Sequence, residues 1–485
     1  MNRDEMLARA LARASPWDMV IIGGGATGMG MAVDAASRGY EVLLLERSDF
    51  GKGTSSRSTK LVHGGVRYLE QGNIALVMEA LRERGILRRN APHLVKDLAF
   101  VVPNYDWWEA PFYGIGLKLY DLLAGKYGFG LSRILSREET LSYLPGIKTE
   151  GLRGGVVYFD GQFDDSRLLI HLAMTAADLG ATLLNYAEVT GFTRGEDGFV
   201  DGVIARCNET SAEIRAPARV VVNATGAFCD TVRLLADPQA TPLIRPSQGI
   251  HLVFDRSFLP GDSAIMVPHT RDKRVMFAIP WLGHTLVGTT DTPVSEVSAE
   301  PVAQDQEVEF ILETAGLYLA KTPTRSDVQS VFAGIRPLVG GDAANTAALS
   351  RDHAIHIDQS GLLSIAGGKW TTYRRMAEDG VNQAATLGRL PERACVTQEL
   401  KIHAYEEVPR NLDAEIARAA REEMARTVED CLARRTRALF LNARQAVAQA
   451  PRVAAILAEE LGRDDAWQQD QVRQFTDLAG NYMLT

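Results

Sequence analysis

The feature that most constrains the fold is a strand, a glycine-rich turn and a helix close to the N-terminus. Residues 19–22 are apolar and predict a buried strand. Three glycines with the spacing G-x-G-x-x-G follow at once: Gly23, Gly25 and Gly28. Such a turn brings backbone amides and the N-terminus of a helix, expected here over residues 26–38, close to a pyrophosphate. A second apolar run, residues 42–45, ends in Glu46, where a carboxylate can accept hydrogen bonds from a ribose diol. Together these elements predict dinucleotide binding.

The polar segment after Glu46 bears on which dinucleotide is bound. Residues 47–65 are rich in serine, threonine and glycine, and they exceed the short turn that a simple nicotinamide-binding fold requires. A loop of this kind can cover the ribitol and phosphates of a flavin. The same composition also occurs in flexible surface loops, so this segment alone leaves both interpretations open.

Length and charge limit the class of protein. With 485 residues the chain exceeds one ordinary core, so two or more structural units are expected. The net charge of −9 argues against general nucleic-acid binding, and no nucleic-acid partner is expected. The four cysteines lack metal-like spacing, which predicts a reducing compartment and no metal site. No apolar run reaches the ~18 residues of a transmembrane helix, and residues 1–17 predict a short amphipathic helix rather than a signal peptide.

The order of the predicted elements indicates an α/β protein whose nucleotide-binding domain is discontinuous. Apolar stretches that predict strands of one sheet recur far apart along the chain: 155–158, 182–186, 219–223 and 362–366. Helices are expected between or after them, over residues 168–179 and 371–387. Strands that return to one sheet from distant positions imply insertions between them. We therefore assign three segments to the nucleotide-binding domain: 15–70, 151–239 and 336–390.

The inserted segments, residues 71–150 and 240–335, have a different pattern. Three stretches alternate apolar and polar residues and are interrupted by Gly, Pro or Asp: 249–254, 275–281 and 285–290. This pattern is typical of an antiparallel sheet, which we expect to form the wall of a substrate pocket. Residues 391–485 are rich in Ala, Arg, Glu and Leu at helical spacing, which predicts a C-terminal helical domain.

Four separated motifs resemble those of one flavoenzyme family. They are the glycine turn at 23–28, TSSRSTKLVHGGVRYL at 54–69, AGIRPL at 333–338 and GGKWTTYR at 367–374. In this order they resemble the FAD-dependent glycerol-3-phosphate dehydrogenases of the aerobic, quinone-linked type, and residues 434–444 are similar to that family's C-terminal helical domain. The resemblance implies a Rossmann-like FAD-binding domain with an antiparallel-sheet substrate domain of the D-amino-acid oxidase type. It also implies oxidation of sn-glycerol 3-phosphate to dihydroxyacetone phosphate.

The resemblance, together with the glycine turn, identifies the residues expected to bind FAD. The helix after Thr371 is expected to direct its N-terminal amides at the flavin edge where negative charge develops. The full set of expected cofactor contacts is Gly23, Gly25, Gly28, Glu46, Arg47, Thr54, Ser55, Ser56, Thr59, Lys60, Leu61, His63, Gly226, Gly368, Thr371 and Thr372.

A phosphorylated substrate requires cations in its pocket. A phosphomonoester carries close to two negative charges at neutral pH, and the planar fork of Arg matches its oxygens. Arg336 lies in an apolar strand end, where an unpaired buried charge is unfavourable, so we favour a function for it. Arg351 precedes Asp352, and pairing with that neighbour is an equal alternative. The residues expected to bind the substrate are Arg67, Tyr68, His251, Arg336, Arg351 and Lys369.

Oxidation of an alcohol also requires a base for the hydroxyl proton. His251 lies in an apolar alternating stretch, where a pKa near neutrality suits general-base catalysis. A histidine satisfied within the core is the alternative, and the resemblance favours the catalytic role. Lys369 is expected to hydrogen bond the developing alkoxide or ketone oxygen. The expected catalytic set is His251, Arg336, Lys369, Arg67 and Arg351.

The resemblance also bears on the electron acceptor and on location. Respiratory members of the family use membrane ubiquinone or menaquinone, whereas the oxygen-using branch carries an extra insertion that this sequence lacks. Aromatic residues and lysines over 107–123 are typical of an interfacial segment, and an ordinary aromatic core helix is an equal alternative. We expect a cytoplasmic homo-oligomer attached peripherally to the inner face of the cell membrane.

Other flavoenzyme functions remain open at this point. One is a dehydrogenase of another polyol phosphate, such as erythritol phosphate, and another is an oxygen-using glycerol-3-phosphate oxidase. An amine or amino-acid oxidase on the same fold would need a carboxylate clamp. A non-catalytic flavin-bound protein would have no reason to gather His251, Arg336 and Lys369 at the flavin.

Overall fold

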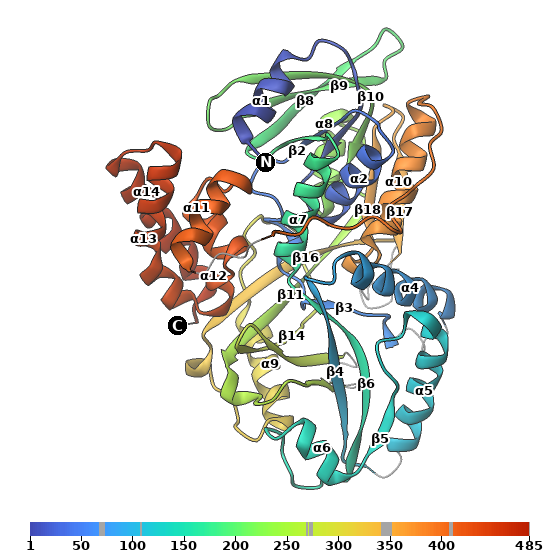
Figure 1. The fold of residues 1–485 in the computed structure, drawn as a ribbon, viewed down its shortest axis with the longest axis vertical. Coiled ribbons are helices and arrows are strands. Elements are labelled where there is room, and N and C mark those ends of the chain that lie inside the picture. The colour runs from blue at the N-terminus through green and yellow to red at the C-terminus, as the bar shows by residue number, and fades with distance from the viewer. Residues whose placement is uncertain are drawn as a thin grey trace.

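The computed structural model describes residues 1–66, 73–106, 109–267, 270, 275–340, 352–406 and 411–484, with the backbone alone for 109–112. Figure 1 shows two sheet-based layers along the long axis of the molecule, with a helical C-terminal region packed at their side. This arrangement is the predicted α/β plan.

In the described residues, the upper sheet of Figure 1 has eight strands. The central strands run parallel in the order β7-β2-β1-β10-β18, and β17 joins the edge antiparallel. Strands β8 and β9 extend from β10 as an antiparallel hairpin. The strands are β1 (Trp17–Ile22), β2 (Val42–Leu45), β7 (Thr182–Leu184), β8 (Ala187–Arg194), β9 (Val200–Cys207), β10 (Glu213–Asn223), β17 (His353–Ile357) and β18 (Leu363–Gly367). Because parallel strands are buried on both faces, they occur as the continuous apolar runs seen in the sequence.

Helices pack against this sheet. Helix α2 is buried along most of its length and packs between α7 and α10. Gly30 of α2 lets the Tyr373 ring approach, since a Cβ there would lie 2.9 Å from Cδ2 of that ring. The helices of this layer are α1 (Arg3–Ala12), α2 (Ala26–Ser37), α7 (Asp165–Asp178), α8 (Cys229–Ala236) and α10 (Tyr373–Leu387).

The second sheet has ten strands in the described residues and is mainly antiparallel. Its path runs β15-β11-β14-β13-β12-β4-β6-β3, while β16 pairs with β11 and β5 pairs with β6. This confirms the antiparallel sheet predicted within residues 240–335. The strands are β3 (Leu61–Val62), β4 (Val95–Asn104), β5 (Arg133–Leu135), β6 (Gly154–Phe163), β11 (Ile244–Asp255), β12 (Ala264–Val267), β13 (Met276–Trp281), β14 (His284–Gly288), β15 (Thr292–Pro293) and β16 (Ser330–Val339).

The placement of β6 corrects one part of the sequence analysis. Residues 155–158 were expected in the nucleotide-binding sheet, but they belong to β6, which pairs with β4 in the second sheet. Strand β6 is buried on both faces, so its apolar run cannot be told from a parallel strand by periodicity. Strand β16 carries residues 336–339 into the second sheet as well. The domain boundaries themselves remain a prediction.

The remaining helices lie around the second sheet and in the C-terminal region. Around the sheet are α4 (Ile74–Asn90), α5 (Glu109–Ala124), α6 (Arg137–Tyr143) and α9 (Asp305–Tyr318). The C-terminal region contains α11 (Leu412–Glu422), a π-helical turn (Asp430–Arg435), α12 (Ala438–Leu441), α13 (Ala443–Leu461) and α14 (Asp465–Ala479). Short 3-10 turns complete the chain: η1 (Thr54–Ser56), η2 (Gly125–Tyr127), η3 (Gly226–Phe228), η4 (Arg256–Phe258), η5 (Arg325–Asp327), η7 (Trp370–Thr372) and η9 (Gly480–Tyr482).

Buried ion pairs join the helical C-terminal region to the nucleotide-binding layer. Asp49, in the loop after β2, receives hydrogen bonds from Arg434 at 2.5 Å and from Arg435 at 2.8 Å. The two guanidinium groups hold the pKa of this carboxyl at about 2, although burial alone would raise it. Removing either the carboxylate or the two guanidinium groups would leave uncompensated charge in the core. These ion pairs therefore hold the C-terminal region to the nucleotide-binding layer. Across the described part of the chain, no helix combines the length and apolar character needed to cross a membrane.

Candidate functional site

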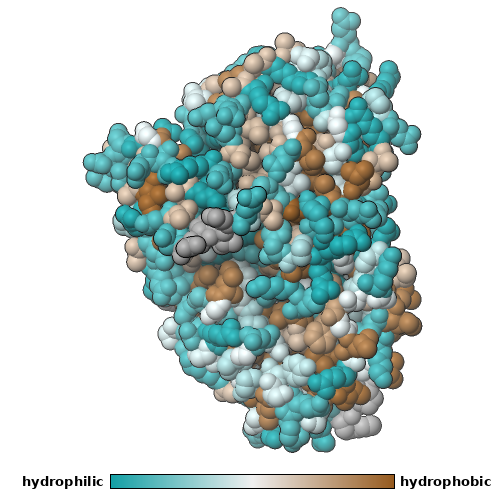
Figure 2. Space-filling view, in the orientation of Figure 1, coloured by the Kyte–Doolittle hydropathy of each residue, from teal (hydrophilic) through white to brown (hydrophobic). Residues whose placement is uncertain are grey.

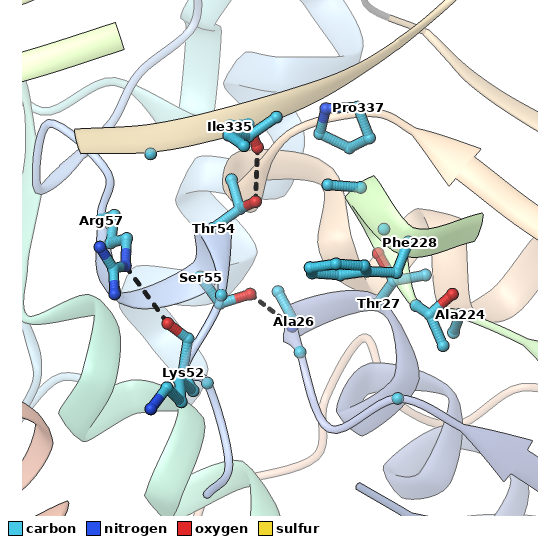
Figure 3. A pocket seen from close by; sticks show the side chains of 18 of the residues that line it. Ala26, Thr27, Lys52, Thr54, Ser55, Arg57, Ala224, Phe228, Ile335 and Pro337 are labelled. Carbon is cyan, nitrogen blue, oxygen red and sulfur yellow. Dashed lines mark hydrogen bonds between the residues drawn. The ribbon is translucent and has the colours of Figure 1, made fainter. Parts of the chain in front are cut away.

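A cavity of about 430 Å³ lies between the two sheets. One side is formed by the chain that follows β1, β2, β10 and β18, and the other by β11 and β16 (Figure 3). In a parallel sheet the carboxyl ends of the strands meet at one edge, which is where open α/β sheets bind their ligands. The cavity therefore joins the predicted dinucleotide site to the predicted substrate wall.

The glycine turn has the geometry that only glycine allows. Gly23 has φ +109°, and a Cβ there would lie 2.7 Å from the carbonyl oxygen of Ala224. A Cβ at Gly28 would lie 2.0 Å from the carbonyl oxygen of Gly23. The turn thus closes tightly against β10 and leaves the N-terminus of α2 facing the cavity, as the binding of a pyrophosphate requires.

Glu46 holds the same turn from the end of β2. Its carboxylate accepts hydrogen bonds from the backbone N–H of Gly24 at 2.7 Å and of Ser48 at 2.9 Å. Burial raises the pKa of Glu46, and these two hydrogen bonds oppose that rise. The side chain lines the cavity and organises the turn at the same time.

The polar loop after Glu46 is tied to both layers and is not a flexible surface loop. Ser55 accepts a hydrogen bond from the N–H of Ala26 at 2.9 Å, at the first turn of α2. Thr54 donates to the carbonyl of Ile335 in β16 at 2.6 Å, and Trp370 donates to the carbonyl of Ser55 at 2.9 Å. Figure 3 shows the first two of these bonds. The loop lines the cavity, and its contact with the ribitol and phosphates of a flavin stays a prediction.

Most of the expected cofactor contacts line the cavity, and four do not. Those that line it are Gly23, Gly25, Glu46, Arg47, Thr54, Ser55, Thr59, Leu61, His63, Gly226, Gly368 and Thr371. Gly28, Ser56 and Thr372 do not line the cavity. Lys60 is fully buried and its ammonium pairs with Asp165 of α7 at 2.7 Å, away from the cavity. The sequence does not reveal this partner, because Asp165 is more than a hundred positions away and meets Lys60 only in the fold.

Three expected substrate or catalytic residues line the cavity, two from the antiparallel sheet and one from the chain after β18. His251 from β11, Arg336 from β16 and Lys369 from the turn before η7 all line the cavity. Arg67, Tyr68 and Arg351 lie outside the described residues. The antiparallel pairing of β11 with β16 explains why His251 and Arg336, far apart in sequence, share one wall of the cavity.

His251 is held as a neutral ring. Its Nε2 is 2.9 Å from Oγ1 of Thr59, and its ring stacks on Phe332 with centroids 4.9 Å apart. Burial, together with the charges of Lys60 and Arg336, holds the pKa of His251 well below its usual range. The sequence analysis expected a pKa near neutrality, and burial makes it lower than that. A neutral imidazole can still accept a proton, and the role of His251 as a base stays a prediction.

Arg336 is oriented by oxygens on three sides. Its guanidinium donates to Oγ1 of Thr289 at 3.0 Å and to the carbonyl of Thr290 at 3.0 Å, and it lies 3.5 Å from the carboxylate of Asp291. Gly249 makes room for it, since a Cβ there would lie 2.4 Å from Nη2. The planar fork is thus preset, which favours bidentate recognition of an anion.

Two glycines direct Lys369 into the cavity. Gly367 and Gly368 both have positive φ, +79° and +74°, so the chain turns sharply after β18. A Cβ at Gly368 would lie 2.3 Å from Sδ of Met376, so another residue there would have to displace that side chain as well as adopt the positive φ. The turn places Lys369 at the start of η7, with its Nζ buried.

The sequence analysis missed the residues that support this wall. Phe332 stacks on His251, while Thr289 and Asp291 orient Arg336. Each becomes a neighbour only through strand pairing, and the sequence contains no motif that marks it. Phe277 and Trp370 also line the cavity and were not singled out.

Comparisons with known proteins agree with this geometry. A family model of FAD dependent oxidoreductases matches residues 18–374. A model of the C-terminal domain of alpha-glycerophosphate oxidase matches residues 336–468. Together the two models span both sheets and most of the C-terminal helical region.

Two curated relatives match nearly the whole chain. The chain is 39% identical over 542 residues to a mitochondrial glycerol-3-phosphate dehydrogenase of Arabidopsis thaliana, covering 96% of this chain and 86% of that protein. It is 38% identical over 532 residues to a mitochondrial glycerol-3-phosphate dehydrogenase of Homo sapiens, covering 95% of this chain and 73% of that protein.

Two solved structures share the fold. A glycerol-3-phosphate dehydrogenase from Bacillus halodurans complexed with FAD aligns with a TM-score of 0.80 and 29% identity, over 99% of this chain and 97% of that one. An L-alpha-glycerophosphate oxidase from Mycoplasma pneumoniae with FAD bound aligns with a TM-score of 0.60 and 17% identity, over 81% and 100% of the two chains. At that lower identity the likeness concerns the fold alone.

Proposed function

We propose a function from one premise: this chain belongs to the family of FAD-dependent glycerol-3-phosphate dehydrogenases, and FAD is its cofactor. The protein oxidises sn-glycerol 3-phosphate to dihydroxyacetone phosphate and transfers the electrons to a membrane quinone. The observation that carries this proposal is the cavity itself, because His251, Arg336 and Lys369 line the same space as the glycine turn and Glu46.

The residues present fit FAD. The turn at Gly23 and Gly28 leaves no space for a Cβ, and the N-terminus of α2 adds partial positive charge beside it. The loop from Arg47 to His63 supplies hydroxyl groups and backbone amides along the cavity. When bound, FAD supplies the two-electron acceptor that takes the hydride from the alcohol carbon.

The basic residues suit the phosphate of the substrate. Arg336 presents a preset fork, and Lys369 adds a second cation from the chain after β18. Arg67, Tyr68 and Arg351 belong to the same proposed substrate set. Several cations are needed because a phosphomonoester approaches two negative charges at neutral pH.

His251 is the proposed general base. Its depressed pKa keeps the imidazole neutral, so it can take the hydroxyl proton as the carbon is oxidised. Lys369 is suited to hydrogen bond the oxygen that develops charge in the same step.

An apolar surface on α5 and β5 supports transfer of electrons at a membrane. Ile115 and Leu122 of α5 are 72% and 77% exposed, and Leu131, just before β5, is 79% exposed. Figure 2 shows hydrophobic side chains gathered on this face at the right of the molecule. Lys118 and Lys126 are exposed beside them. Apolar groups flanked by cations are the pattern of peripheral membrane attachment.

Anaerobic flavin reduction tests the proposed chemistry. Purified holoenzyme is mixed without oxygen with sn-glycerol 3-phosphate, erythritol 4-phosphate or glycerol, and the visible flavin absorbance is followed. We expect rapid bleaching by glycerol 3-phosphate and slower bleaching by the other two. If erythritol phosphate bleaches the flavin faster than glycerol 3-phosphate, the proposed substrate is wrong and erythritol phosphate takes its place. If neither phosphorylated polyol bleaches the flavin, the proposal is refuted. Reoxidation by a short-chain ubiquinone, compared with oxygen, separates a dehydrogenase from an oxidase.

Vesicle sedimentation tests the membrane contact. We expect Leu122→Glu to reduce co-sedimentation with anionic phospholipid vesicles while turnover with a soluble dye is retained. Leu317→Glu on α9, where the leucine is 53% exposed, is the matched control and is expected to sediment as the unchanged protein does. Equal sedimentation of the unchanged protein, Leu122→Glu and Leu317→Glu would exclude the surface on α5 and β5 as the membrane contact. The cytoplasmic location and the homo-oligomer remain predictions.

A further inference from the structure

The catalytic base is held by one hydrogen bond that comes from outside its own sheet. Oγ1 of Thr59 lies 2.9 Å from Nε2 of His251, whereas Nδ1 is buried without a hydrogen-bond partner among the described residues. The partner of one ring nitrogen determines which nitrogen carries the proton and how the ring is oriented. The position of the Thr59 hydroxyl therefore controls the state of His251.

A single carboxylate fixes the residues on both sides of Thr59. The N–H and hydroxyl of Ser58 donate to Oδ2 of Asp165 at 3.1 and 2.7 Å. The ammonium of Lys60 donates to the same oxygen at 2.7 Å. Asp165 is fully buried at the first turn of α7, so this is a rigid support rather than a surface contact.

The C-terminal helical region reaches into the same cluster. Arg437, which precedes α12, donates to Oδ1 of Asp165 at 3.0 Å and to the carbonyl of Ser56 at 2.9 Å. Its side chain is 1% exposed. Phe440 of α12 packs edge-on against Phe332, the ring on which His251 stacks, with centroids 4.8 Å apart. The C-terminal region thus contacts the residues that hold both partners of His251. Arg437 bonds Asp165, which holds the residues beside Thr59, and Phe440 packs against Phe332.

We propose that Thr59 is a positioning residue for His251, and that Arg437 holds Thr59 in place through Asp165. This inference rests on the proposed function, because it takes His251 as the base. It assigns the C-terminal region a part in catalysis that requires no contact with substrate. It also accounts for Lys60, which the sequence analysis placed at the cofactor and the structure places in this cluster.

The first experiment compares Thr59→Val with Thr59→Ser. Valine keeps the shape of threonine and removes the hydroxyl, whereas serine keeps the hydroxyl. We expect Thr59→Val to lower kcat by about 10- to 100-fold, with KM changed less than about twofold and full FAD content, and Thr59→Ser to retain most of kcat. Unchanged kcat in Thr59→Val, or loss of FAD, would overturn the role of Thr59.

The second experiment tests the link to the C-terminal region. Arg437→Gln leaves the buried Lys60–Asp165 pair balanced in charge. We expect a severalfold lower kcat with unchanged KM. The matched control is Ser330→Ala, which removes a buried hydrogen bond of 2.8 Å to the carbonyl of Leu439 in α12 without touching Asp165. Equal kcat in the two variants would overturn the link.

Two further variants keep the outcome interpretable. If Arg437→Gln is not recovered folded, Ser58→Ala removes one donor to Asp165 without changing charge, and unchanged kcat in it would overturn the step by which Asp165 holds Thr59, and with it the proposed action of Arg437. His251→Gln separates this inference from the proposed function. An active His251→Gln enzyme refutes the base itself, whereas an inactive one beside a fully active Thr59→Val refutes only the positioning role.

Discussion

Replacing Arg336 by Ala should weaken substrate binding through loss of its contact with the phosphate. The guanidinium is preset by Thr289 and by the carbonyl of Thr290, both at 3.0 Å, so little side-chain entropy is lost when it binds an anion. A hydrogen bond to a charged group contributes about 1.5–3 kcal/mol. Arg336 is 23% exposed, so solvent screens part of a bidentate contact, and a net loss of about 3 kcal/mol is expected.

That loss corresponds to a rise in KM for glycerol 3-phosphate on the order of 100-fold, since each 1.4 kcal/mol is a factor of ten. The expected change in kcat is much smaller, because the phosphate takes no part in the bonds that break when the C2 alcohol is oxidised. Arg336→Lys keeps the positive charge and loses the planar fork of the guanidinium. Its KM should therefore lie between that of the unchanged protein and that of Arg336→Ala.

Steady-state turnover with a soluble dye measures both constants, and the ratio of flavin to protein absorbance checks that FAD is retained. Glycerol is the decisive control because it lacks the phosphate. With glycerol, Arg336→Ala and the unchanged protein should differ less than about twofold in kcat/KM. An equal loss with glycerol and glycerol 3-phosphate, or a colourless variant, would refute the assignment of Arg336 to the phosphate.

Three other predictions concern the cofactor, the pH profile and stability. Glu46→Ala removes the acceptor for two backbone amides of the glycine turn, so FAD affinity should fall by about 10- to 100-fold, measured by flavin retention on gel filtration. Because the pKa of His251 lies well below 6.5, the base stays neutral in mildly acidic solution. The acid limb of kcat/KM should therefore lie below pH 6.5, and a limb above pH 7 would contradict this. Asp49→Asn leaves Arg434 and Arg435 without their shared carboxylate and should lower the free energy of unfolding by about 3–5 kcal/mol, measured in urea. Since the pKa of Asp49 falls from 3.8 to about 2 on folding, its contribution to stability is present above pH 4 and is lost as the pH falls toward 2, which acid unfolding of the two proteins tests.

The parts of the site that the sequence revealed are those made by local chain geometry. The glycine turn, Glu46 and the turn at Gly367 and Gly368 each require a residue type at a fixed short spacing. Such requirements leave a signal in the sequence because no other residue fits the backbone. The parallel strands were found for a similar reason, since burial on both faces demands a continuous apolar run.

Long-range contacts produced the errors and the omissions. Strand β6 was assigned to the wrong sheet because an apolar run does not specify its hydrogen-bonded neighbour. Lys60 was placed at the cofactor because its motif is next to the glycine loop, whereas its partners Asp165 and Arg437 come from distant helices. Phe332 and Asp291 have no motif at all.

The amino-acid sequence by itself determined the dinucleotide turn, the two kinds of sheet and the family, and it predicted the chemically active side chains. Only the tertiary structure decided which of these side chains share the cavity, because the pairing of β11 with β16 brings His251 and Arg336 to one side of it and Thr59 lies 2.9 Å from the ring of His251. Local conformation depends on residues a few positions apart, and a pattern records it. The pairing of distant surfaces depends on the packing of the whole chain, and no short pattern contains that information.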